Sequence, residues 1–185
     1  MLFADQPGHI VYLTSAGASL YDRSHRLSTQ AWPSEVIQNL EVADPAGLEG
    51  VMRQLVDRQA LRDQRLMIVM DDSLVFQRSL QYADTAKDQA AIKEALERMP
   101  FAAETRGVVV AGGDMTMIVY VTNRALYEAA RAACETAGAR VEAAVPAPAY
   151  GLKAVTGQLT KTQLRTLLSE RKPRQLTNFL APQSS

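Results

Sequence analysis

The sequence predicts a mixed α/β domain, and three observations support this. Apolar runs of strand length alternate with segments in which apolar residues recur every three to four positions. In order, they give three strands, a helix, a strand, an inserted unit, a helix and a last strand. Such alternation is typical of a sheet covered by helices. We therefore expect a ribonuclease-H-like layer with a strand–helix–strand–strand unit inserted between Ser73 and Thr122.

The composition limits the class of protein. With 185 residues, 47% of them hydrophobic, the chain fits one domain or two small subdomains that share a core. Lys plus Arg and Asp plus Glu each number 20, so no overall field favours nucleic acid or an acidic membrane. One cysteine excludes an intramolecular disulfide, and two histidines offer little for a zinc site. We expect a reducing cytoplasm, and no apolar window approaches the length that crosses a bilayer.

A β-hairpin opens the chain. Residues 10–14 and 18–21 are its strands, 15–17 are its turn, and 27–32 give a third strand. Asp44-Pro45 is typical of a helix N-terminus, with an N-cap followed by proline at the first helical position. The helix that follows has an apolar stripe that should pack on the sheet, made of Leu48, Val51, Met52, Leu55 and Val56.

The central elements follow. Residues 66–70 are continuously apolar, which predicts a strand covered on both faces. Residues 74–80 alternate, which predicts a half-exposed strand. Its apolar side should carry Leu74, Phe76 and Leu80. Thr85 to Met99 should form a helix that Pro100 ends.

The predicted core ends with a hairpin, a helix and a strand. Residues 107–111 and 115–122 are the strands of the hairpin, joined by Gly112-Gly113-Asp114. Asn123 should cap the next helix, and Gly138 should be its C′ residue. Residues 140–145 form the last strand.

From Gly151 onward the sequence changes character and predicts a basic tail. Thr160 can cap a short helix carrying Leu164, Leu167 and Leu168. Residues 176–182 are an isolated apolar stretch. The tail allows three interpretations: a solvated charge run, a surface for anionic lipid, or an arm that delivers the apolar stretch to a partner. An extended peptide can gain hydrogen bonds at a sheet edge, which favours the arm. The cations, opposed only by Glu170, are Lys153, Lys161, Arg165, Arg171, Lys172 and Arg174.

The sequence predicts no catalytic residue, cofactor site or metal site. Asp71-Asp72 follows a strand and could act as a carboxylate pair, but no third acid or histidine stands at a suggestive spacing. Gly112-Gly113-Asp114 would need to open a helix to cradle a phosphate, whereas a strand follows it.

The remaining reactive side chains also point to structural roles. Cys134 lies on the apolar face of a predicted helix, so it should be buried rather than nucleophilic. His9 and His25 have no second ligand at a metal-binding spacing.

Three sequence segments resemble those of a known protein family. They are Arg65 to Met70 followed by Ser73 to Leu80, the helix end from Glu94 to Pro100, and Ala137 to Val141 before Val145-Pro146-Ala147. With the order of elements over Ile10 to Leu152, they resemble the family of the actin-like pilus-assembly protein PilM and the cytoplasmic domain of the type II secretion protein GspL.

This resemblance implies a ribonuclease-H/actin-like half domain with an inserted 1C-like subdomain. Residues 1–72 and 123–152 would form the 1A-type subdomain, 73–122 the inserted unit, and 153–185 the basic tail with an apolar docking peptide. It also implies a non-catalytic scaffold, or pseudo-ATPase, of a type IV pilus or type II secretion assembly platform. Such a scaffold is cytoplasmic and peripheral to the inner membrane.

The sequence departs from this family at the nucleotide site. In nucleotide-binding relatives the first hairpin carries an acid and glycines that meet phosphate and metal, whereas here Tyr12 to Ala18 has no acid. The second actin-like half, with its other phosphate and adenosine contacts, is missing from the chain. We therefore expect neither ATP binding nor another cofactor.

The C-terminal stretch is similar to a second family feature. Leu176 to Pro182 resembles the Asn-Leu-Leu-Pro-type cytoplasmic peptide of PilN, with Ala181 as an extra residue. The resemblance implies docking into a groove between the two subdomains of this chain or a neighbour, with platform proteins or a second copy as partners. The chain would then be the cytoplasmic part of a longer membrane protein. The implied partner-binding residues are Leu176, Asn178, Phe179, Leu180 and Pro182.

Two other classes remain open. One is a metal-dependent nucleotide phosphohydrolase of ribonuclease-H-like fold, using Asp71, Asp72 and Asp114 with magnesium. The other is an α/β adaptor unrelated to pili.

Overall fold

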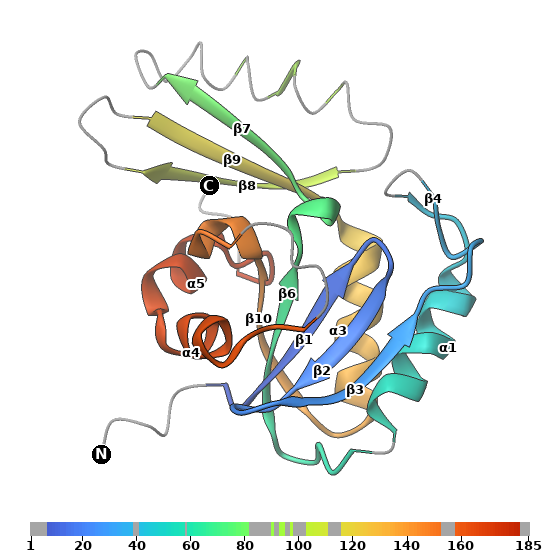
Figure 1. Ribbon diagram of the computed structural model, residues 1–185. Helices are drawn as coiled ribbons and strands as arrows, with labels where there is room; N and C mark the ends of the chain where they lie inside the picture. The colour runs from blue at the N-terminus through green and yellow to red at the C-terminus, as the bar shows by residue number, and fades with distance from the viewer. Residues whose placement is uncertain are drawn as a thin grey trace.

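The computed structural model describes residues 7–38, 41–57, 59–81, 90, 93–94, 97, 103–110, 116–152 and 158–181. A five-stranded sheet in the order β10-β6-β1-β2-β3 forms its centre (Figure 1). β1 pairs antiparallel with β2 and parallel with β6, and β10 extends the parallel part beyond β6. The strands are β1 (His9–Thr14), β2 (Gly17–Tyr21), β3 (Arg26–Ala31), β6 (Arg65–Met70) and β10 (Arg140–Pro146). The predicted ribonuclease-H-like layer is confirmed.

Strand β6 is buried on both faces, as its continuous apolar run predicts. Every residue from Leu66 to Met70 is fully buried. Leu66, Ile68 and Met70 belong to one core, whereas Met67 and Val69 belong to a second core on the other face. This alternation follows from the two-residue repeat of a strand.

Helices α1 (Pro45–Val56) and α3 (Arg124–Thr136) cover the first face. Their predicted caps are confirmed, because Asp44 accepts the Gly47 N–H and Asn123 accepts the Ala125 N–H. At the end of α3, Gly138 has φ +85°. The Ala139 N–H donates to the Cys134 carbonyl and the Gly138 N–H to that of Glu135, which completes a Schellman motif.

The second face is covered by the segment expected to be a basic tail. It forms α4 (Lys161–Ser169) and α5 (Arg171–Thr177), which follow the short helix η2 (Ala147–Tyr150). Figure 1 shows α4 and α5 across the sheet from α1 and α3. Thr160 caps α4 through a complete capping box with Gln163. Four leucines of this region belong to the second core. Leu159 precedes the cap, and α4 contributes Leu164, Leu167 and Leu168. Residues 158–181 therefore belong to the folded domain.

A second, three-stranded sheet has the order β7-β9-β8, with both pairings antiparallel. Its strands are β7 (Phe76–Gln81), β8 (Ala103–Val110) and β9 (Thr116–Asn123). The pairing of β8 with β9 confirms the predicted hairpin, and β8 begins earlier than expected. A two-stranded ribbon of β4 (Ile37–Gln38) and β5 (Glu41–Val42) completes the described strands.

The start of β7 differs from the prediction. Leu74 lies in the short helix η1 (Asp72–Leu74) instead of the strand, because Asp71 caps that turn. Phe76 is 41% exposed, so the predicted apolar side of Leu74 and Phe76 is wrong. The turn delays the start of the strand, so Leu74 and Val75 are buried before β7 begins, whereas Phe76 at its first position is exposed.

Other predicted features lie largely or wholly outside the described residues. The side chain of Leu80 and the turn at 112–114 are outside them. Of the helix expected at 85–99, only Ala90, Lys93, Glu94 and Glu97 are described, and they are helical. Within the part of the chain that is described, no helix has the length and apolar character to cross a membrane.

Gly17 at the start of β2 and Gly50 in α1 have different surroundings, which predict opposite effects of their substitution by alanine. A Cβ at Gly17 would lie 2.3 Å from the Gln30 backbone oxygen, so Gly17→Ala should lower the free energy of unfolding by about 1–3 kcal/mol. Gly50, inside α1, has nothing within 4 Å of its Cβ position, so Gly50→Ala should raise it by about 0.5–1 kcal/mol. Urea unfolding measures both, and equal effects would contradict the packing described at β3.

Candidate functional site

The free side of β10 is the candidate interaction site among the described residues. β10 ends the sheet, and its outward-facing backbone groups bond to Asn178 and Phe179. We call residues 178–181, which follow α5, the edge segment. The Ala144 N–H donates to Asn178 Oδ1 at 3.0 Å, and the Phe179 N–H donates to the Ala144 carbonyl at 2.8 Å. Asn178 Nδ2 donates to the Glu142 carbonyl at 3.2 Å. The Asn178 amide thus takes the place of a peptide group in a further strand.

Phe179 fixes the edge segment on the opposite face from α5. Its side chain is 2% exposed and belongs to the first core, where its ring centroid lies 5.7 Å from that of Tyr127 in α3. Because α5 lies against β10 and η2 on the other side, the chain passes over the edge of the sheet at Asn178. α5 also contacts β8, so this region touches both sheets.

The predicted partner-binding residues differ in their surroundings. Asn178 and Phe179 bind β10 of their own chain, and Leu180 packs partly against the first core. Leu176 is 47% exposed on α5. Pro182 lies outside the described residues. Binding of these residues to another protein stays a prediction.

The sequence did not indicate the residues that receive the edge segment. Glu142 and Ala144 present backbone groups, which carry no sequence signal. Tyr127 is one of several buried residues of α3, and nothing in the sequence distinguishes it from the others as a contact of the edge segment. Only the order of strands in the sheet shows that β10 has a free edge.

Asp71, the other candidate, is a buried structural residue. It is 2% exposed and accepts the Tyr12 O–H at 2.5 Å and the Ser73 N–H at 3.0 Å. Burial, and then the hydrogen bond to Asp71, raise the pKa of Tyr12 well above its usual range, so the phenol remains a donor. The Ser15 N–H also donates to Ser73 Oγ at 3.0 Å, which ties the first hairpin to η1.

This arrangement gives different surroundings to Asp71 and Asp72, the two described acids of the phosphohydrolase hypothesis. Asp71 is enclosed between β1 and η1, whereas Asp72 is exposed in the first turn of η1. Asp114 lies outside the described residues. The described acids do not converge on a shared opening.

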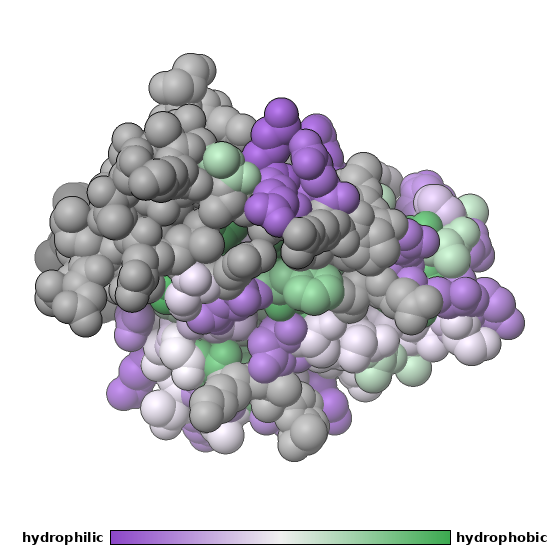
Figure 2. Space-filling view, turned by 90° about the horizontal axis from the view of Figure 1, so that it is seen from above, coloured by the Kyte–Doolittle hydropathy of each residue, from purple (hydrophilic) through white to green (hydrophobic). Residues whose placement is uncertain are grey.

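Cys134, His9 and His25 differ in their surroundings. Cys134 is buried in the first core, and burial raises its pKa to about 12. Burial lowers the pKa of His9, while His25 lies exposed beside Asp22. No group of three metal-ligating residues occurs in the described ranges. Seen from above, the described surface shows apolar residues only as small areas among hydrophilic ones (Figure 2).

The buried pair predicts a measurable cost for Tyr12→Phe. Loss of the phenol leaves a carboxylate oxygen of Asp71 without this donor, which should lower the free energy of unfolding by about 1–3 kcal/mol in urea. Tyr120→Phe is the matched control, because Tyr120 is a buried residue and its hydroxyl makes no hydrogen bond to the residues described. Equal costs for the two variants would contradict the role given to Asp71.

The edge contacts predict that Asn178→Ala exposes one particular amide. The Ala144 N–H points away from β6 and bonds to the Asn178 side chain, so its hydrogen exchange should accelerate about tenfold or more. Residue-resolved NMR provides the measurement. Gln175→Ala, an exposed change on α5, should leave this rate unchanged. An unaltered Ala144 rate in Asn178→Ala would show that the edge segment does not hold β10.

Comparison with known proteins connects this geometry to a fold. No protein-family model and no curated protein sequence matches the chain. Among solved structures, it is similar to a PilM-PilN type IV pilus biogenesis complex with a TM-score of 0.50 and 15% identity, over 78% of this chain and 48% of that one.

Two further structures are similar to a smaller extent. The cytoplasmic domain of EpsL, an inner membrane component of the Vibrio cholerae type II secretion system, gives a TM-score of 0.44 and 12% identity over 77% of this chain and 58% of that chain. A Bacteroides thetaiotaomicron protein with an actin-like ATPase fold and unknown function gives a TM-score of 0.45 and 12% identity, over 80% of this chain and 55% of that chain. This chain spans about half the length of each of the three. Together with the sheet order, the PilM-PilN similarity confirms the predicted actin-like half-domain fold.

Proposed function

We propose that this chain is a non-catalytic cytoplasmic scaffold of a type IV pilus or type II secretion assembly platform at the inner membrane. It acts through protein–protein contacts. The observation that carries the proposal is the edge segment on β10, within a fold like that of PilM in a complex with PilN. A scaffold of this kind needs a defined surface for a peptide, and the edge of β10 has the features of one.

The edge of β10 combines two elements of peptide recognition. Backbone groups of Glu142 and Ala144 bind the side-chain amide of an asparagine, as they do that of Asn178. The Ala144 carbonyl also accepts the backbone N–H of the next residue, whatever its side chain. The space that Phe179 fills beside Tyr127 selects a large apolar side chain after the asparagine. We infer that a peptide with asparagine followed by a large apolar residue, from a platform protein or a second copy, binds here in exchange for the edge segment.

The absence of catalysis is part of the proposal. The contacts of Asp71 support it. Because the Asp71 carboxylate already accepts hydrogen bonds from Tyr12 and Ser73, it has little freedom to hold a metal or a water. Tyr12 lies in β1, within the first hairpin, where the resemblance implies an acid in nucleotide-binding relatives and this chain has none between Tyr12 and Ala18.

A complementation experiment tests the peptide site. In Phe179→Ala, the edge segment should detach and the Ala144 amide should exchange rapidly, while amides of β6 stay protected. Adding a synthetic peptide of residues 174–185 should restore protection of Ala144, and the same peptide with Asn178→Ala and Phe179→Ala should not. If Phe179→Ala is folded but the native peptide does not restore protection of the Ala144 amide, the edge of β10 is not a site that a separate peptide can occupy.

The same assay separates a pilus scaffold from an unrelated adaptor. A PilN-type peptide with Asn-Leu-Leu-Pro should protect Ala144 in Phe179→Ala at concentrations comparable to those of the native peptide. If only the native peptide binds, the site is real but the platform role is wrong.

Magnesium-ATP provides the test of catalysis. We expect it to leave hydrogen exchange in residues 10–20 and around Asp71 unchanged, because Asp71 is already satisfied within the chain. Protection of either region, lost in Asp72→Asn, would favour the phosphohydrolase instead.

A further inference from the structure

The balanced total charge hides a strong local asymmetry. Residues 151–185 contain six cations and one acid, so the first 150 residues carry an excess of acids. In the structure, four of the cations lie on α4 and α5 and are exposed, whereas Arg174 is half-buried. We call the four the basic face, which consists of Lys161, Arg165, Arg171 and Lys172.

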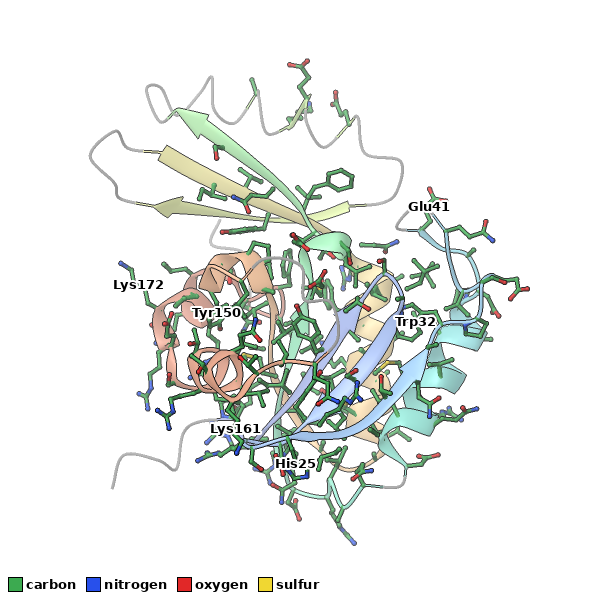
Figure 3. All side chains as sticks on the ribbon, viewed as in Figure 1. His25, Trp32, Glu41, Tyr150, Lys161 and Lys172 are labelled. Atoms are coloured by element: carbon green, nitrogen blue, oxygen red, sulfur yellow. The ribbon has the colours of Figure 1, made fainter. Side chains whose placement is uncertain are left out.

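The fold holds the basic face outward. On α4, Leu164, Leu167 and Leu168 point into the second core, which leaves Lys161 and Arg165 on the solvent side. Figure 3 places Lys161 and Lys172 at the outer side of the two helices. Leu176 lies four residues after Lys172, on the same side of α5, and is 47% exposed. An apolar side chain therefore accompanies the charges.

The basic face is not neutralised within the described chain. Several other cations have an acid within 4 Å, as in the pairs Arg53–Glu49, Arg131–Glu135 and Arg140–Asp63. No acid of the described residues lies within that distance of the basic face. Lys161 and Arg165 also stand four residues apart, where like charges weaken a helix. Helix stability therefore does not explain the arrangement.

We propose that the basic face binds the anionic surface of a lipid bilayer. Its charges sit on long, mobile side chains spread over two helices, which suits a fluid layer of headgroups. Leu176 can enter the interface beside them, as apolar residues do in helices that lie on membranes. An acidic protein segment would be better matched by cations already held in place by neighbours. The edge segment lies at the end of α5, so this contact would also set the distance of β10 from the membrane.

Vesicle co-sedimentation of the full chain tests the proposal. Vesicles of phosphatidylcholine with 30% phosphatidylglycerol should bind the chain at low salt, and pure phosphatidylcholine should not. Replacing Lys161, Arg165, Arg171 and Lys172 with Gln should weaken binding by about tenfold or more. The matched control replaces Arg53, Arg62, Arg124 and Arg140 with Gln, which changes the net charge equally and should have little effect. Thermal unfolding verifies that both variants fold.

Three outcomes would overturn the proposal. Equal losses of vesicle binding in the two variants would mean that binding depends on net charge and not on the basic face. Equal binding to neutral vesicles would mean that the charges are not involved. Binding to polyglutamate but not to anionic vesicles would assign the basic face to an acidic protein segment. Each of these leaves the complementation assay at β10 untouched, so failure here is separate from failure of the scaffold role.

Discussion

Strand β6 requires apolar cover on both of its faces, and the rest of the fold follows from this requirement. Leu66, Ile68 and Met70 are covered by α1 and α3. Met67 and Val69 need a second layer, because a strand with apolar residues on both faces is buried only when both faces of its sheet are covered. α4 supplies that layer with three buried leucines. The burial of apolar residues of β6 thus holds α4 in place, although the two elements are far apart in the sequence.

The position of α5 in turn determines how the sheet ends. An unpaired edge such as β10 invites association with other strands. The chain leaves α5 at this edge, and Asn178 and Phe179 satisfy it with one amide side chain, one backbone N–H and one buried ring. Under the proposed function, the same contacts that protect the edge would also define which peptide could replace them.

Local signals were predictable from the sequence, and relations across the sheet were not. The caps Asp44, Asn123 and Thr160 are predictable because capping depends on residues two or three positions away. The exposure of Phe76 is not, because the turn that Asp71 caps moves the start of β7. The apolar C-terminal stretch stood out in the sequence. Its contacts with Ala144 and Tyr127 depend on which strand lies at the edge, and that order has no local signature.

The most direct test of this account asks whether the edge segment binds its own chain in solution. Nuclear Overhauser effects between the rings of Phe179 and Tyr127 report the contact, since their centroids lie 5.7 Å apart. We expect these cross-peaks within single molecules of the dilute chain, and none between differently labelled copies. Their absence, or their appearance only between copies, would contradict a fold that closes its own sheet edge.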